Sequence, residues 1–560
     1  MPQAGSRPRV ELSHQACDIC RRRKVKCHLR TGSSKSSCER CERLNLACTF
    51  ILPSKTRGPK KRLENLFRET YALPLNIDFR ASVDPGVKEH HVSNTRYGTD
   101  DLCDRGLFKK IMQDYLDCIY PMVPVVHRPS FLKALEEDQD CEDEGFLALT
   151  LSIAALVVAT MANKFRIYQS YAPPLRFSSR KEVVHFCYQR ILSLRTSSYY
   201  DELNFQKFAI SYIYFAAFLQ LGDHNWSRMV SVEAMQIARL LNLHRISEYD
   251  GLNCIETQLR KKGFWLVFYC YVLCNLSHAH LQNLHGERLS YLDPAILNSI
   301  DPNDLMPIEV DDEFIFKNEV TAPMTPRPCL VTGFIHHSRV FLAAIRDPYL
   351  KPSPKEPCPC VRAHDLNLQV HFFQDRLDCL RHLLIDIPPC LQLSAPVSNA
   401  IGVDGSSIEA IETPQSQFAS MRANLHITHI WLQSLILDQL EVALSHQQRQ
   451  IPALGSPDHT ENFDQRALWL YREELCRQLF FILYNFPQSS LEANGLHAAN
   501  KVRDVASSLL ACPFHPEDPI AKRVAEYVQR STDILSRLDS SEVMNAMHLQ
   551  TWIDTDRIPK

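Results

Sequence analysis

Residues 16–48 read ACDICRRRKVKCHLRTGSSKSSCERCERLNLAC and combine six cysteines with a dense run of basic residues. The spacing is Cys-x2-Cys-x6-Cys, then a ten-residue spacer, then Cys-x2-Cys-x6-Cys again, which makes two near-duplicate halves. A Cys-x2-Cys turn brings two sulfurs onto one metal ion, and six further residues, about one and a half helical turns, return a third sulfur to the same place. Each half therefore supplies three thiolates. The six positions are Cys17, Cys20, Cys27, Cys38, Cys41 and Cys48.

Two zinc ions fit this number of sulfurs. Zinc in structural sites takes four ligands, so two ions require eight ligand positions, and six thiolates fill them only if two thiolates bridge both ions. The resulting cluster keeps a negative charge, and neighbouring cations offset it and lower the pKa of the thiols. The basic residues of this segment exceed what the cluster needs, so we expect them to have a second role.

The basic residues lie at the amino-terminal end of the chain. Residues 1–62 contain 16 Lys and Arg against 4 Asp and Glu, a net charge of +12, whereas residues 63–560 contain 46 against 60, a net charge of −14. A polycation of this kind pairs with a polyanion such as nucleic acid. A second basic run predicts a nuclear-import signal, a linker that follows DNA phosphates, or both. It consists of Lys55, Arg57, Lys60, Lys61 and Arg62.

The rest of the sequence predicts a mainly α-helical protein without a catalytic site. Gly makes up only 16 of 560 residues, below the usual share of about 7%. No Gly-rich nucleotide loop, nucleophile elbow or HExxH motif occurs, so we do not expect an enzyme. Apolar periodicity predicts helices from about residue 97 onward, without the even turn spacing of strands. The expected helices are 104–120, one from about 130, 144–163, 179–193, 204–222, 226–243, 257–284, 329–346, 363–387, 417–446, 463–485, 495–511 and 519–538.

Composition divides the chain into six segments. We expect a disordered start, the metal-binding module, a basic linker, two successive helical regions and a tail. A short helix in the linker, within residues 63–73, is either a dimerisation helix or a plain linker helix. The tail mixes acidic and apolar residues, which is typical of activation segments and equally of a frayed terminus. The segments are 1–14, 15–50, 51–100, 101–320, 321–538 and 539–560.

Several other features have ordinary interpretations. Two uncharged runs, 145–162 and 264–284, have the length of membrane spans but contain polar residues, so we interpret both as buried helices and expect no membrane contact. The first residues lack an apolar signal core, which favours a reducing compartment. Paired histidines such as His336 and His337 are interpreted as core or surface residues. The run Asp311-Asp312-Glu313 is interpreted as a solvated acidic stretch that precedes a helix.

The segment CDICRRRKVKC and the six-cysteine spacing closely resemble the fungal zinc binuclear cluster (Zn2Cys6) transcription regulators. The resemblance implies that Cys17 and Cys38 bridge the two ions. Cys20 and Cys27 would then complete one site, and Cys41 and Cys48 the other. It also implies that a helix from Cys20 enters the DNA major groove, where Lys24 and adjacent backbone carbonyls read a CGG triplet. Residues nearer the phosphates would be Arg21, Arg22, Arg23 and Lys26.

A more diffuse resemblance covers residues 105–320 and concerns the helical middle homology region of the same family. Its signposts are YPMVPVVHRPSF (120–131), 226–245, 260–269 and 306–315, while HGERLSYLDP (285–294) replaces the Gly-Arg-Pro that commonly follows the third. In the module, His28 and Ser37 stand where many members have Asp and Pro, which affects the loop between the halves and leaves the six cysteines intact.

These features predict a small Zn2Cys6 domain followed by a large all-α regulatory region, in a nuclear, sequence-specific regulator of RNA polymerase II transcription. Its partners would be double-stranded DNA and the transcription machinery; pairing as a homodimer and a small-molecule inducer stay open. The alternative is a zinc-dependent protein-binding adaptor or ubiquitin ligase. Such a protein would not need the basic residues 21–26 on one helix, and duplex DNA would not compete for its partner.

Overall fold

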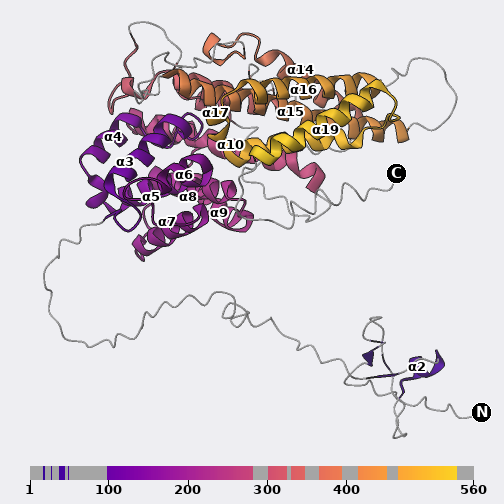
Figure 1. The fold of residues 1–560 in the computed structure, drawn as a ribbon, viewed down its shortest axis with the longest axis horizontal. Coiled ribbons are helices and arrows are strands. Elements are labelled where there is room, and N and C mark those ends of the chain that lie inside the picture. The colour runs from indigo at the N-terminus through magenta and orange to yellow at the C-terminus, as the bar shows by residue number, and fades with distance from the viewer. Residues whose placement is uncertain are drawn as a thin grey trace, which may run out of the picture. The chain divides into compact units, whose positions relative to one another are not determined.

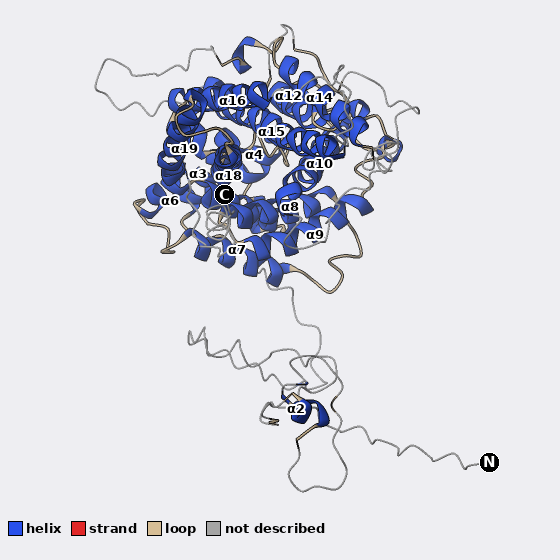
Figure 2. Ribbon diagram, turned by 90° about the vertical axis from the view of Figure 1, so that its right-hand side faces the viewer, coloured by secondary structure: helices blue, strands red, loops and turns tan. Residues whose placement is uncertain are grey.

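The structure is a computed structural model of the 560-residue chain, which forms two compact units, Met1–Val92 and Ser93–Lys560. No β-strand occurs among the described residues, and the mainly α-helical prediction is confirmed (Figure 2). The predicted disordered start, the linker helix within 63–73 and the acidic tail lie outside the described residues. The described residues are 17, 18, 20, 27, 37–44, 48, 49, 98–281, 300–323, 329–346, 348, 365–393, 414–450 and 465–538.

In the first unit, helix α2 (Glu39–Arg43) begins directly after Cys38. The sulfur of Cys38 accepts a hydrogen bond from the amide of Cys41 at 3.4 Å, as an N-cap side chain does. Arg40 and Arg43 lie in the last turn, where positive charge is favourable beside the free carbonyl groups. The metal-binding sequence thus sets where this short helix starts.

In the second unit, the first group of helices packs around α5. Five helices of this group begin at a side-chain cap. The carboxylate of Asp143 accepts from the amides at 145 and 146, and the caps of the other four are Asp104, Ser179, Asn204 and Asp223. Residues 146–160 of α5 are all buried. The group comprises α3 (Arg105–Asp114), π-helical η1 (Tyr115–Ile119), α4 (Arg128–Glu136), η2 (Gln139–Cys141), α5 (Glu144–Thr160), α6 (Ala162–Gln169), α7 (Arg180–Leu194), α8 (Phe205–Gln220) and α9 (His224–Leu240).

The second group of helices packs around the long helix α15, which contacts α12, α14, α16 and α18. Figure 1 shows the indigo and magenta helices on one side of this unit and the orange and yellow helices on the other. The group comprises α12 (Leu330–Ala343), α14 (Leu366–Leu383), η6 (Pro389–Leu391), α15 (Pro414–Gln450), α16 (Gln465–Asn485), α17 (Gln488–Glu492), α18 (Gly495–Ser508), η7 (Leu509–Ala511) and α19 (Pro519–Leu538).

Helix α10 (Cys254–Leu281) joins the two groups, because it packs on α8 and α9 and also on α12 and α15. The short turns η3 (Ile246–Tyr249), η4 (Pro302–Leu305) and η5 (Asp312–Phe314) flank it in sequence. One hydrophobic core runs from Leu102 to Leu535, so the predicted regions 101–320 and 321–538 share a core.

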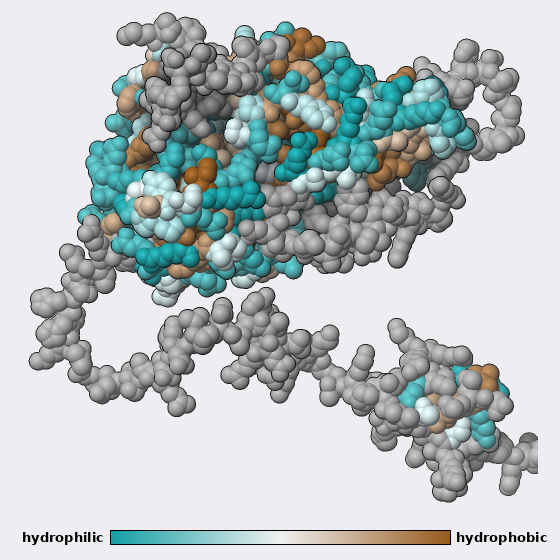
Figure 3. All heavy atoms as spheres, in the orientation of Figure 1, coloured by the Kyte–Doolittle hydropathy of each residue, from teal (hydrophilic) through white to brown (hydrophobic). Residues whose placement is uncertain are grey.

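On the face of the helical unit that Figure 3 shows, the coloured residues are largely hydrophilic, with apolar residues among them. Within the described residues, no single helix is both long and apolar enough to cross a membrane, although α5 and α6 reach that level together as a pair bent by 108°. The apolar run of α5 is enclosed by neighbouring helices, as expected, and residues 264–272 of the second run are also buried.

Candidate metal centre

The six cysteines come together in the first unit as two overlapping groups of four sulfurs. One group is Cys17, Cys20, Cys27 and Cys38, and the other is Cys17, Cys38, Cys41 and Cys48, with all sulfurs of a group within 4.8 Å of one another. The Sγ atoms of Cys17 and Cys38 lie 3.7 Å apart, as do those of Cys20 and Cys38. Cys17 and Cys38 belong to both groups, which is the arrangement that bridging ligands require.

The two halves of the centre repeat each other in their hydrogen bonds. Cys17 and Cys38, which are 21 residues apart, each accept a hydrogen bond at 3.4 Å from the amide three residues later. Each also donates its own amide to the last cysteine of its half: Cys17 to Cys27 at 3.4 Å and Cys38 to Cys48 at 3.3 Å. The backbone of each half therefore holds its three sulfurs in the same arrangement.

A contact outside the cysteines closes the module. The amide of Asp18 donates to the carbonyl oxygen of Thr49 at 2.8 Å, and the Thr49 hydroxyl donates to the Asp18 carboxylate at 2.7 Å. These bonds join the start of the first half to the residue that follows the last cysteine. Sequence reasoning missed this pair, because neither residue belongs to the metal-ligand pattern.

The sulfur positions fit zinc. A tetrahedral site with Zn–S distances of about 2.3 Å has sulfurs about 3.8 Å apart, close to the observed separations. Burial acts to raise the pKa of the Cys38 thiol, but hydrogen bonds from the Cys41 amide and from neighbouring thiols lower that pKa to about 6. The pKa of Cys17 is lowered in the same way, so both shared thiols favour the ligating thiolate form. The centre holds two zinc ions.

The predicted DNA-contacting side chains, Arg21 to Lys24 and Lys26, lie outside the described residues, as does the second basic run, so these assignments stay predictions. Their flanking residues Cys20 and Cys27 are buried at the metal centre. With the 21-residue offset, Lys24 corresponds to Asn45, and its neighbours correspond to Leu44 and Leu46. The two halves are alike in ligand geometry but only the first carries a basic segment.

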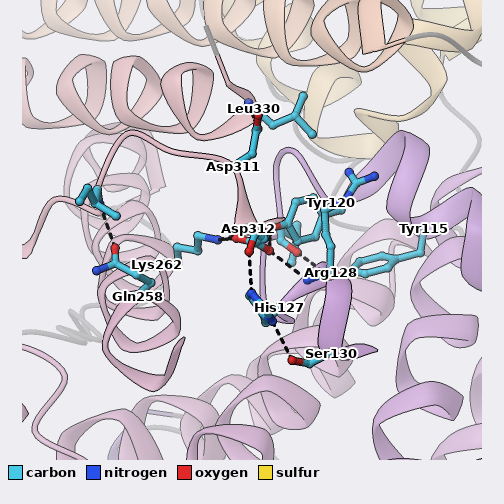
Figure 4. A network of polar contacts seen from close by, with 12 residues as sticks. Tyr115, Tyr120, His127, Arg128, Ser130, Gln258, Lys262, Asp311, Asp312 and Leu330 are labelled. Atoms are coloured by element: carbon cyan, nitrogen blue, oxygen red, sulfur yellow. Dashed lines mark hydrogen bonds and ion pairs between the residues drawn. The ribbon is translucent and has the colours of Figure 1, made fainter. Parts of the chain in front are cut away.

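A buried ion pair organises the helical unit (Figure 4). Lys262 of α10 and Asp312 of η5 are 1% and 3% exposed, and the lysine Nζ lies 2.8 Å from the carboxylate. The same carboxylate accepts from the hydroxyl of Tyr120 and from the amide of Arg128 at 3.0 Å. His127 contacts the carbonyl of Asp312 at 2.8 Å through Nε2. The interpretation of Asp311-Asp312-Glu313 as a solvated run is therefore wrong for Asp312, because Lys262 compensates its burial.

Helix α10 holds the following segment through successive side chains. The Gln258 side chain accepts from the amide of Ile308 at 2.8 Å, and Lys261 donates to the carbonyl of Asp304 at 2.8 Å. One turn further, the indole of Trp265 donates to the carbonyl of Leu305 at 3.0 Å. Three of the four sequence signposts, 120–131, 260–269 and 306–315, thus meet in one network. His337 is a buried residue that contacts Thr428, as interpreted.

Two known family profiles match separate parts of the chain. The sequence profile of the fungal Zn(2)-Cys(6) binuclear cluster domain matches residues 15–58, and that of the fungal specific transcription factor domain matches residues 112–308. No solved structure matches the chain.

Two proteins of Saccharomyces cerevisiae are similar to parts of this chain. The maltose fermentation regulatory protein MAL63 is 28% identical over 263 residues, which cover 46% of this chain and 49% of that protein. The maltose fermentation regulatory protein MAL13 is 28% identical over 254 residues, which cover 45% of this chain and 48% of that protein. The chain therefore matches about half the length of these relatives.

Proposed function

Because the chain is a fungal zinc-cluster transcription factor with a fungal-specific regulatory domain, we propose that it regulates transcription in the nucleus by reading CGG-type triplets in double-stranded DNA. The observation that carries this proposal is the pair of overlapping four-sulfur groups, with a basic segment between the buried residues Cys20 and Cys27. A metal-fixed turn of this kind holds a short basic helix rigidly enough to enter the major groove.

The chemistry of the basic segment fits base reading. Guanine presents its O6 and N7 acceptors in the major groove, where the ammonium group of Lys24 can donate to them. The N4 amino group of cytosine is a donor, for which a backbone carbonyl is a suitable acceptor. Phosphate contacts by the neighbouring arginines would position the helix without reading sequence. A protein-binding adaptor would have no use for this concentration of charge.

The remaining parts of the proposal follow from the layout of the chain. The second basic run would follow phosphates or direct nuclear import, and the helical unit would be the regulatory part that contacts the transcription machinery and an inducer. Since the names of the relatives refer to maltose fermentation, genes of carbohydrate use are the first targets to test by genome-wide mapping of bound sites.

A comparison of two kinds of lysine variant tests base reading. Lys24→Ala should remove about 1–3 kcal/mol of discrimination between a CGG duplex and one with a mutated triplet. The matched variant Lys60→Ala/Lys61→Ala should weaken binding to all duplexes alike and reduce the log-salt slope by about one unit per lost phosphate contact. Affinities would be measured by fluorescence anisotropy across a salt titration with the zinc-loaded chain.

The outcomes separate the hypotheses. Unchanged CGG preference in Lys24→Ala at every salt concentration contradicts the role of Lys24 as base reader. Lack of duplex binding by the zinc-loaded wild type would favour the adaptor. A preference for two triplets over one would support pairing of modules through residues 63–73 or the helical unit, whereas equal affinity would argue for a monomer.

A further inference from the structure

Helices α15 and α18 meet along a polar seam. The Asn494 side chain donates to the carbonyl of Ser420 at 3.3 Å. Further along, Lys501 contacts Asn424 and Thr428, and the indole of Trp431 donates to Asp504 at 2.8 Å. The residue numbers rise together on both helices, so the helices run parallel, and the polar contacts recur along the seam. Packing of α18 on the body therefore depends on buried hydrogen bonds as well as apolar contact.

Lys501 lies at the centre of this seam without a carboxylate partner among the described residues. It is 8% exposed, and its Nζ donates to the Thr428 hydroxyl oxygen at 2.6 Å and to the Asn424 amide oxygen at 3.2 Å. The face of the Trp431 ring lies 6.0 Å from Nζ. Both hydrogen-bond acceptors are neutral, so nothing here balances a buried ammonium charge. Burial accordingly lowers the pKa of Lys501 to about 7.

The titratable neighbours do not supply a counter-charge. On α12, His337 accepts a hydrogen bond at Nε2 from the Asn424 amide, because that nitrogen of asparagine can only donate. On α18, His497 is the other titratable neighbour, and Asp504 is held by Trp431. Burial and the nearby charge of Lys501 lower the pKa of both histidines, that of His497 to about 4. In the closed seam, Lys501 is therefore the group of this cluster that changes charge near neutral pH.

We propose that Lys501 makes the α15–α18 seam a pH-responsive contact of the regulatory unit, which loosens when the amine is protonated. In the closed seam the neutral amine satisfies the same two acceptors without a buried charge. In the open seam the amine reaches water and holds its proton. Protonation near neutral pH thus favours opening of α18, and this property does not depend on the DNA sequence that the module reads.

The size of the effect follows from linkage. With a closed-state pKa of about 7 and an ordinary value when open, Lys501 alone makes opening about tenfold more frequent near pH 6 than near pH 8. Lys501→Met keeps the length of the side chain and removes this tenfold contribution. It should keep the smaller response of His497, whose lowered pKa returns to its ordinary value on opening and favours opening about fourfold near pH 6 relative to pH 8. Lys501→Arg remains charged at both pH values and should give a seam that is loose throughout.

Hydrogen exchange of the full zinc-loaded chain, followed by mass spectrometry of peptides within 494–508, measures opening of α18. Labelling times are adjusted so that the chemical exchange rate is the same at both pH values. The expected result is a ratio of opening near pH 6 to opening near pH 8 that is about tenfold larger in the wild type than in Lys501→Met. Lys133→Met, which changes a lysine with a 74% exposed side chain, serves as the matched control and should behave like wild type.

Two results would overturn the proposal: equal opening of wild-type α18 at both pH values, or the same pH response in Lys501→Met as in wild type. If Lys501→Arg fails to fold, the Lys501→Met comparison alone decides. If Lys501→Met fails to fold, the wild type still decides when it is set against peptides of α5 from the same digest: a pH ratio no larger than the roughly fourfold contribution of His497 overturns the proposal.

Discussion

Replacing Asp312 by alanine should destabilise the helical unit more than any exposed acidic substitution. The change removes the acceptor for the Lys262 ammonium group, the Tyr120 hydroxyl and the Arg128 amide. Lys262 would keep only the Tyr120 oxygen, 3.3 Å from its Nζ. A buried charge that loses its partner costs about 3–5 kcal/mol, so a loss of that size is expected.

Urea unfolding of the zinc-loaded chain measures this loss as a shift of the midpoint at unchanged slope. Glu313→Ala is the matched control, because it removes an exposed carboxylate next to Asp312. The double variant Lys262→Met/Asp312→Leu removes both charges together. It should recover only the part of the loss that comes from the unpaired lysine, because the Tyr120 hydroxyl and the Arg128 amide still lack their acceptor.

Asp312 should make the stability of the helical unit fall at acidic pH. Burial acts to raise the pKa of the Asp312 carboxyl, but Lys262, Tyr120 and the Arg128 amide hold that pKa below its ordinary value. A carboxylate with a lowered folded-state pKa contributes stability that is present above its unfolded pKa of about 3.9 and is lost as the pH falls through the folded value. Asp312→Asn should therefore flatten the acid limb of the stability curve. Equal midpoints for Asp312→Ala and Glu313→Ala, with the acid limb of Asp312→Asn unchanged, would refute this reasoning.

Other variants test the remaining features. Cys17→Ala or Cys38→Ala should release both zinc ions, whereas Cys48→Ala should retain part of one, as elemental analysis of the purified proteins would show. Thr49→Val should remove about 1 kcal/mol from the module by deleting its bond to Asp18, seen as loss of zinc at lower chelator concentration. Gly333→Ala should destabilise the helical unit by about 1–3 kcal/mol in urea, because the added methyl group would overlap the Met421 side chain.

The helical architecture could be predicted because its signals are local. The expected helix 144–163 is split at Met161, where α5 ends and α6 begins, and 495–511 ends in the turn η7. These differences concern helix ends, which depend on backbone geometry that periodicity does not encode. The metal centre could also be predicted: the cysteine spacing indicates two halves of three thiolates with two bridges, and the family resemblance assigns the bridges to Cys17 and Cys38.

The buried network could not be predicted, because its partners are far apart in sequence. Asp312 is 50 residues from Lys262 and 192 residues from Tyr120. Three consecutive acidic residues ordinarily indicate solvent exposure, and only a cation placed by the tertiary fold reverses that expectation. The sequence did single out the segments that meet there, but as separate signposts. The environment of Lys501 could not be predicted for the same reason, because the packing of α12, α15 and α18 buries this lysine beside neutral acceptors.

The two halves of the metal centre show how metal binding and DNA binding are separated in this chain. Their amide-to-sulfur bonds correspond pairwise, so the zinc geometry makes no distinction between them. The two halves differ in charge, because the first carries Lys24 where the second has Asn45. The second half also exposes the apolar side chain of Leu44. A phosphate backbone would attract the first half far more strongly than the second. The metal would therefore fix the shape of both halves, and under the proposed function the side chains between the second and third cysteines would decide which half faces DNA.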